Sequence, residues 1–88
     1  MDWEISFSPR AAKVFKKLDT AQLRRVSKFL REVSTLEDPR SRGKALTANK
    51  AGLWRWRVGD YRVVADIVDA RVVVIVVDLG HRSKIYTH

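Results

Sequence analysis

The fold of this protein is decided by one stretch near the carboxyl end, LWRWRVGDYRVVADIVDARVVVIVVDL, which covers residues 53–79. The pairs Gly59-Asp60 and Asp69-Ala70 divide it into three segments that are rich in valine, isoleucine and aromatic residues, the composition of strands. Connections this short join only antiparallel neighbours, because parallel strands need a long crossover. The stretch therefore predicts a three-stranded antiparallel meander.

Side-chain alternation within the meander predicts what each face of the sheet carries. Residues 72–77 are apolar on both faces, which is typical of a central strand covered by helices. Residues 53–58 instead alternate, with Arg55 and Arg57 on one face and Trp54 and Trp56 on the other. If the tryptophans enter the core, the two arginines lie on the opposite face or at its rim.

The residues before the meander predict one more strand and two helices. Residues 3–7 alternate between apolar and polar side chains, as a half-buried strand does. Ser8-Pro9 then supplies a helix cap and a first-turn proline, and a second helix begins at Asp19 and ends before Pro39. We therefore expect one α+β domain over residues 1–88, in the order β-α-α-β-β-β. Two N-terminal helices would cover one face of a mainly antiparallel four-stranded sheet, with a loop from Pro39 to about residue 52.

The composition favours a polyanionic partner and excludes several kinds of chemistry. There are 18 Lys and Arg against 10 Asp and Glu, a net charge of +8. The chain has no cysteine, so disulfides, zinc ribbons, iron–sulfur clusters and thiol catalysis are excluded. No apolar run reaches the length of a transmembrane helix, and the acidic start does not resemble a signal peptide. We expect a cytoplasmic protein that does not bind membranes.

Basic residues without an acidic neighbour fill the segment between Pro39 and Gly59. Arginine and lysine there can neutralise phosphates, and guanidinium groups can stabilise the extra charge of a phosphoryl transition state. A solvated surface is the alternative interpretation for any one of them. The candidate nucleic-acid-binding residues are Arg40, Arg42, Lys44, Lys50, Arg55 and Arg57.

No metal or other cofactor is expected, because the aspartates follow no metal-binding spacing and Asp69 is best explained as a turn residue. Metal-free RNA cleavage needs a group that activates a ribose hydroxyl, a group that protonates the leaving oxygen, and cations around the phosphate. The short tail after residue 80 holds side chains of these kinds: His81, Arg82, Lys84, Tyr86 and His88. Anchoring of the chain end by Tyr86, with His81 as a loop residue, is the alternative.

Three motifs resemble the RelE/ParE superfamily of bacterial type II toxins. They are ISFSPRAAK at residues 5–13, LWRWRVGDYRVVA at 53–65 and GHRSKIY at 80–86, and together with the strand between the last two they cover nearly the whole chain. The resemblance implies a RelE-like fold, related to microbial ribonucleases. It also implies growth arrest by one of two activities. RelE-type toxins cut mRNA in the ribosomal A site by metal-free attack of the 2′-OH and so inhibit translation. ParE-type toxins inhibit DNA gyrase without being enzymes.

Residues near the carboxyl end of the chain favour the RelE branch of the superfamily. By resemblance, the catalytic residues are Arg62, Arg82 and Tyr86: the arginines would hold the scissile phosphate, and Tyr86 would orient or activate the 2′-OH or stack on a base. Where the RelE pattern has a lysine pair, this chain has Arg55 and Arg57, which bind phosphate but resist deprotonation. The general acid or base is therefore left open between Lys44, His81 and His88.

The resemblance also implies the partners. A RelB-like, partly disordered antitoxin would wrap the toxin, and the complex would bind operator DNA through the antitoxin. The ribosome and mRNA would be the other partners.

Overall fold

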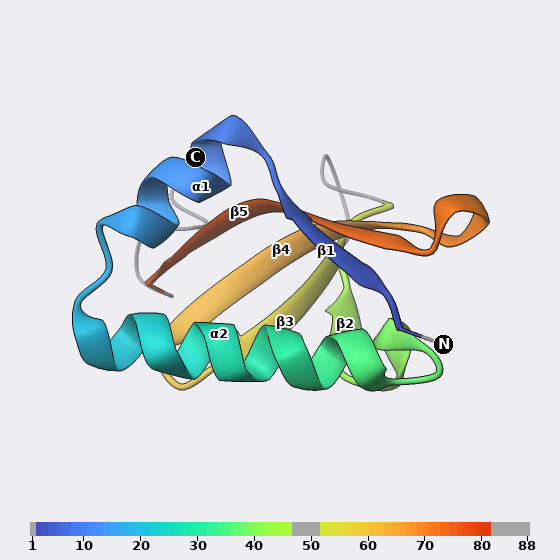
Figure 1. Ribbon diagram of the computed structural model, residues 1–88, viewed down its shortest axis with the longest axis horizontal. Coiled ribbons are helices and arrows are strands. Elements are labelled where there is room, and N and C mark those ends of the chain that lie inside the picture. Colours follow the sequence, from blue (N-terminus) through green and yellow to red (C-terminus); the bar gives the residue numbers. More distant parts are fainter. Residues whose placement is uncertain (1, 47–51, 82–88) are drawn as a thin grey trace.

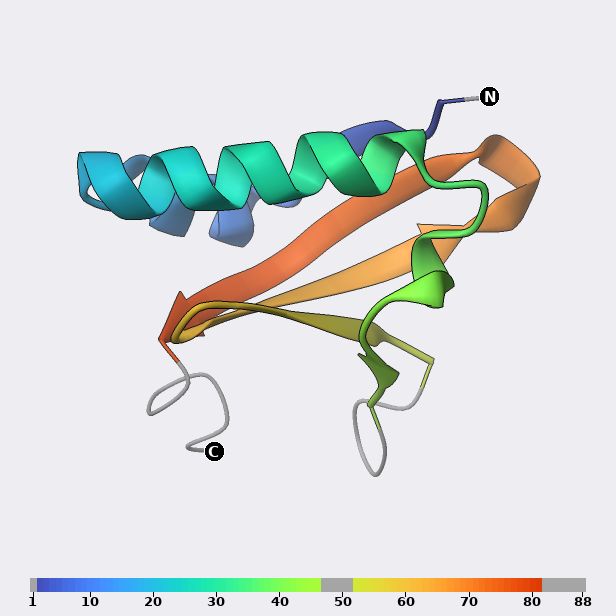
Figure 2. The ribbon, with the colours of Figure 1, turned by 90° about the horizontal axis from the view of Figure 1, so that it is seen from below.

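The structure, a computed structural model, describes residues 2–46 and 52–81. Two helices lie on one side of a five-stranded sheet (Figures 1 and 2). The helices are α1 (Pro9–Lys16) and α2 (Thr20–Thr35), and the strands are β1 (Glu4–Phe7), β2 (Lys44–Ala45), β3 (Trp54–Val58), β4 (Tyr61–Val68) and β5 (Val73–His81). This α+β architecture confirms the predicted fold class.

The sheet has the order β1-β5-β4-β3-β2. The β3–β4 and β4–β5 pairs are antiparallel, as the meander predicts. The N-terminal strand β1 pairs in parallel with β5, the last strand of the chain. Strand β5 therefore lies inside the sheet, between the edge strand β1 and β4, which agrees with its apolar sequence. Among the described residues, no helix is long and apolar enough to cross a membrane.

Both helices begin where their sequence caps predict. The Ser8 hydroxyl accepts a hydrogen bond from the Ala11 amide at 3.2 Å and donates one to the Val77 carbonyl at 3.1 Å. Asp19 Oδ1 accepts from the Gln22 amide at 2.9 Å, which caps α2. The Ser8 hydroxyl therefore also connects the start of α1 to β5.

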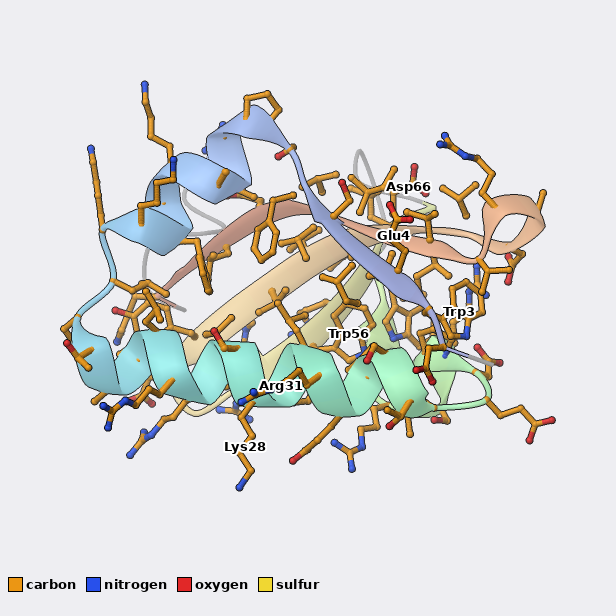
Figure 3. The ribbon with its side chains drawn as sticks, in the orientation of Figure 1. Trp3, Glu4, Lys28, Arg31, Trp56 and Asp66 are labelled. Atoms are coloured by element: carbon orange, nitrogen blue, oxygen red, sulfur yellow. The ribbon has the colours of Figure 1, made fainter. Side chains whose placement is uncertain are left out.

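The core lies between α2 and the sheet, and Trp56 is its largest side chain (Figure 3). The indole is 1 % exposed, packs edge-on against Phe29 with ring centroids 6.0 Å apart, and donates a hydrogen bond to the Pro39 carbonyl at 3.2 Å. Trp54 packs partly buried beside this core, while Arg57 is exposed on the other side of β3. The predicted division of β3 between tryptophans and arginines is confirmed.

A fifth strand, β2, lies where a loop was expected. Lys44 pairs with Arg55 and Ala45 with Trp54. Gly43 makes this possible, because it has φ +85° and a Cβ there would lie 2.2 Å from the Arg55 carbonyl oxygen. Two residues are too few to give a strand period, so the sequence does not indicate this pairing.

Candidate nucleic-acid interface

Four basic side chains share the sheet face that is turned away from the helices. Directly opposite residues of neighbouring strands point to the same side, and the register pairs Lys44 with Arg55 and Arg57 with Arg62. Arg55 and Arg57, two residues apart on β3, share that side as well. The sheet thus gathers Lys44, Arg55, Arg57 and Arg62, here called the sheet cations, on one face.

Arg62 is the most unusual of the sheet cations. Its Nε and Nη1 atoms are buried and have no hydrogen-bond partner among the described residues. The residue directly opposite on β3 is Arg57, a like charge, and the one opposite on β5 is Gly80, which places no side chain beside it. Like charges in direct opposition and unpaired buried donors both cost stability. An anion bound between Arg57 and Arg62 would offset the repulsion of the two charges and would accept hydrogen bonds from the unpaired donors of Arg62.

Arg40 and Arg42 differ from the sheet cations because acidic side chains from distant elements already pair with them. Both terminal nitrogens of Arg40 lie 2.9 Å from the carboxylate of Asp69, and Arg42 Nη1 lies 3.2 Å from Glu32 Oε1. The basic segment lacks an acidic residue in sequence, but the fold supplies one to each of these arginines. Their contribution to nucleic-acid binding stays a prediction, and the geometry assigns them a tertiary role as well.

The Arg40–Asp69 pair gives a pH-dependent prediction. Its hydrogen bonds lower the pKa of Asp69 and raise that of Arg40. A lowered carboxyl pKa adds stability above the unfolded-state value of about 3.9, and this is lost as pH falls through the folded-state value. We expect Asp69→Asn to lower the melting temperature at pH 7 and to match the parent protein at pH 2 to 3. Melting curves from pH 2 to 8 measure this, and a gap that is the same at every pH would contradict it.

His81 lies on the other face of the sheet from Arg62. It is paired with Tyr61 at the end of β5, and the two rings meet edge-on with centroids 5.7 Å apart. Tyr61 in turn packs against the core on the helix side. Of the three general acid or base candidates, the structure therefore brings Lys44 to the face of the sheet cations and places His81 away from it.

The remaining candidates, Lys50, Arg82, Tyr86 and His88, lie outside the described residues. Arg82 directly follows the last residue of β5, next along the chain to His81. Among the parts of the chain that are described, no group of three or more His, Asp or Glu side chains is placed to hold a metal ion. Asp78 instead forms an ion pair with Arg10 of α1, in which Asp78 Oδ1 lies 3.5 Å from Arg10 Nε.

The sequence motifs did not reveal two features of this interface. One is β2, which brings Lys44 next to Arg55. The other is a β-bulge between β4 and β5, where Val64 pairs with Asp78 but Ala65 pairs with Val76. The bulge lets Val76 and Leu79 both face the core, which sets Gly80 opposite Arg62.

Two helices on one face of the sheet and clustered basic side chains on the other define the class of the protein as a small basic α+β domain. The family model described as the ParE toxin of the type II toxin–antitoxin system, parDE, matches residues 5–86. The chain belongs to the RelE/ParE superfamily of type II toxin–antitoxin toxins.

Solved structures of RelE toxins are similar to this chain over nearly its whole length. The toxin–antitoxin complex RelBE2 from Mycobacterium tuberculosis aligns at 27 % identity and a TM-score of 0.84, covering 96 % of this chain and 95 % of that one. The isolated Escherichia coli RelE toxin aligns at 26 % identity and 0.71, covering 97 % and 92 %. The intact E. coli RelBE complex aligns at 25 % and 0.71, covering 90 % and 95 %. Among curated proteins, no sequence matches significantly.

Proposed function

We propose that this toxin is a ribosome-dependent endoribonuclease that acts in the cytoplasm and cleaves mRNA in the A site without a metal ion. The observation that carries the proposal is Arg62, whose buried Nε and Nη1 atoms have no partner among the described residues and which lies directly opposite Arg57. Such a pair fits a phosphodiester, because a guanidinium binds two phosphate oxygens at once. The similarity to RelE toxins supports the same activity.

In the proposed reaction, one bond to phosphorus forms and another breaks. The 2′-oxygen attacks the adjacent phosphorus, the bond to the 5′-oxygen of the next nucleotide breaks, and a 2′,3′-cyclic phosphate and a 5′-hydroxyl result. The 2′-OH loses its proton to the base and the leaving oxygen gains one from the acid. Arg62 stabilises the additional negative charge on the phosphorane oxygens, together with Arg82. Tyr86 orients or activates the 2′-OH, and Lys44 is the general acid or base candidate on the same face.

Gyrase inhibition is the second candidate, because the matching family model is that of ParE toxins. Two assays on the purified chain separate the functions: protein synthesis by a reconstituted translation system, and DNA supercoiling by gyrase. The endoribonuclease proposal requires that synthesis stops while supercoiling proceeds. Inhibited supercoiling with normal synthesis would establish the alternative.

An antitoxin is the proposed partner, since relatives were solved as toxin–antitoxin complexes. A groove of about 290 Å³ runs between α2, α1 and the edge strand β1, and its apolar walls include Ile5, Phe7, Phe15 and Leu30. Its apolar lining suits the apolar side of an amphipathic segment. The adjacent strand β1 is an edge strand of the sheet, so an extended antitoxin segment could also pair with it.

A bulky residue in this groove tests the docking site. Ser27 lines it and is partly exposed. We expect Ser27→Trp to weaken binding of the cognate antitoxin at least about 10-fold, since the indole would occupy the groove, while the toxin keeps its activity. Titration calorimetry measures the affinity. Arg71→Trp, an exposed site outside the groove, is the control, and equal affinity of both variants would place the antitoxin elsewhere.

A further inference from the structure

The connection that leads from α2 into β2 is held by side chains from two other parts of the fold. It begins with the 3₁₀ turn Pro39–Ser41 and continues into β2, which carries Lys44. Figure 2 shows the connection, in green, between the end of α2 and β2. Residues 39–45 are here called the Lys44 segment.

Strand β2 alone gives this segment little support. Only Lys44 and Ala45 pair with β3, and β2 lies at the edge of the described sheet. Gly43, directly before Lys44, has φ +85° and the conformational freedom of a residue without a Cβ. A strand this short is below the usual length, and such elements open locally at low cost. The position of Lys44 therefore depends on contacts that the rest of the segment makes.

Asp69 makes the most extensive of these contacts. Its carboxylate oxygens accept hydrogen bonds from both terminal nitrogens of Arg40, each at 2.9 Å, which is the two-point geometry that suits a guanidinium and a carboxylate. The same guanidinium donates to the Ile67 carbonyl at 3.3 Å. Most surface ion pairs contribute little, but two-point pairs are the exception. The pair thus joins the Lys44 segment to the turn between β4 and β5.

Glu32 and Trp54 hold the same segment from other directions. Glu32 of α2 pairs with Arg42 at 3.2 Å between Oε1 and Nη1, and the Trp54 indole donates a hydrogen bond to the Arg42 carbonyl. Trp54 also packs against the core, so changing it would disturb more than this segment. Asp69 is exposed, so its contact can be removed without altering the core.

Asp69 lies too far from the sheet cations to touch RNA that they bind. It directly follows β4 and is seven residues beyond Arg62, which corresponds to about 23 Å along an extended strand. Its contacts lead instead through Arg40 to the segment that carries Lys44. An effect of Asp69 on the proposed reaction is therefore expected to pass through Lys44.

We propose that Asp69 is a positioning residue for RNA cleavage: through Arg40 it fixes the Lys44 segment and so holds Lys44 beside Arg55 for proton transfer. This inference rests on the proposed function, in which Lys44 is the general acid or base on the face of the sheet cations. Misplacing a catalytic group by about 1 Å can lower a rate about 100-fold, even when the change is remote. Because Glu32 and Trp54 still hold the segment, the loss of Asp69 should have a smaller effect.

The test is single-turnover cleavage of mRNA on programmed ribosomes at pH 7, over a range of toxin concentrations. We expect Asp69→Asn to lower the maximal rate about 10-fold and to leave the half-saturating concentration unchanged, because catalysis and not binding is affected. Asp69→Glu restores the carboxylate and should cleave within about 3-fold of the parent. The control is Glu4→Gln, which removes an equal charge from an exposed residue of β1, at the opposite edge of the sheet from β2.

A double-mutant cycle shows whether the effect passes through Lys44. In a Lys44→Met background, Asp69→Asn should lower the rate by less than about 2-fold, because the group that Asp69 positions is already absent. An equal factor in both backgrounds would overturn the proposal. So would a Lys44→Met protein that cleaves like the parent, or a loss in Glu4→Gln as large as that in Asp69→Asn.

Amide hydrogen exchange in the free protein gives a second readout that needs no catalysis. The Leu46 amide donates to the Leu53 carbonyl at 3.0 Å, so its exchange reports the opening of β2 from β3. We expect Asp69→Asn to raise its exchange rate at least about 3-fold and Glu4→Gln to leave it unchanged. Unchanged exchange in Asp69→Asn would overturn the proposal.

The two assays separate this inference from the proposed function. If the parent protein cleaves mRNA and Asp69→Asn cleaves equally fast, only the present inference fails. If the parent protein cleaves no mRNA, the proposed function fails and the catalytic role of Asp69 fails with it. Faster exchange of the Leu46 amide in Asp69→Asn would then assign Asp69 a structural role alone.

Discussion

Arg62→Met is expected to lower mRNA cleavage about 100- to 1000-fold, the usual loss when one preorganised donor to a transition-state anion is removed. Methionine keeps an unbranched stem of similar length but removes a charge whose Nε and Nη1 have no partner among the described residues. Replacing an unpaired buried charge with an apolar group is neutral or stabilising. We therefore expect the melting temperature to stay the same or to rise, so that activity and stability change in opposite directions.

Arg71→Met is the matched control for this variant. Arg71 is exposed in the 3₁₀ turn Asp69–Arg71, beyond the opposite end of β4 from Arg62. Its loss should change neither cleavage nor the melting temperature. Single-turnover cleavage on programmed ribosomes and a thermal melt measure both variants. A fully active Arg62→Met protein, or one that melts well below the parent, would show that Arg62 has a structural role.

Trp56→Ala should lower the free energy of unfolding by about 3–5 kcal/mol, the range for truncating a buried aromatic side chain. Trp56 is 1 % exposed and contacts Phe29 of α2. Its Nε1 also binds the Pro39 carbonyl, so its removal leaves a buried acceptor unsatisfied. Since small domains have a total stability of about 5–15 kcal/mol, this one change would leave much of the protein unfolded at 37 °C.

Trp56→Phe separates the two contributions of this residue. It keeps an aromatic ring in the core but removes the hydrogen bond to Pro39, and we expect a smaller loss of about 1–3 kcal/mol. Denaturant titrations of the three proteins at pH 7 provide the comparison. If both substitutions cost less than about 1 kcal/mol, Trp56 does not join α2 to the sheet in the way described.

Most of the fold could be predicted because its signals are local. The Ser8 and Asp19 caps, the alternation in β3 and the apolar run of β5 each report on a few neighbouring residues. Features that depend on contacts between distant segments could not be predicted in this way. Strand β2 forms only because Gly43 allows the chain to approach Arg55, and the bulge in β5 follows from packing rather than from composition.

The same distinction applies to the candidate site. Sequence alone identified Arg55, Arg57 and Arg62 as basic residues of two adjacent strands, and the register then placed them on one face. The acidic partners of Arg40 and Arg42 come from β-hairpin and helix positions 29 and 10 residues away along the chain, so the charge pattern near them was misleading.

Primer extension on an mRNA under translation in vitro tests the central claim most directly. The reactions contain the purified toxin, the Arg62→Met variant or no protein, each with and without ribosomes. The proposed function predicts cuts within codons in the A site that require ribosomes and are lost in the variant. Intact mRNA at every codon with the parent toxin, or cuts that persist without ribosomes, would contradict it.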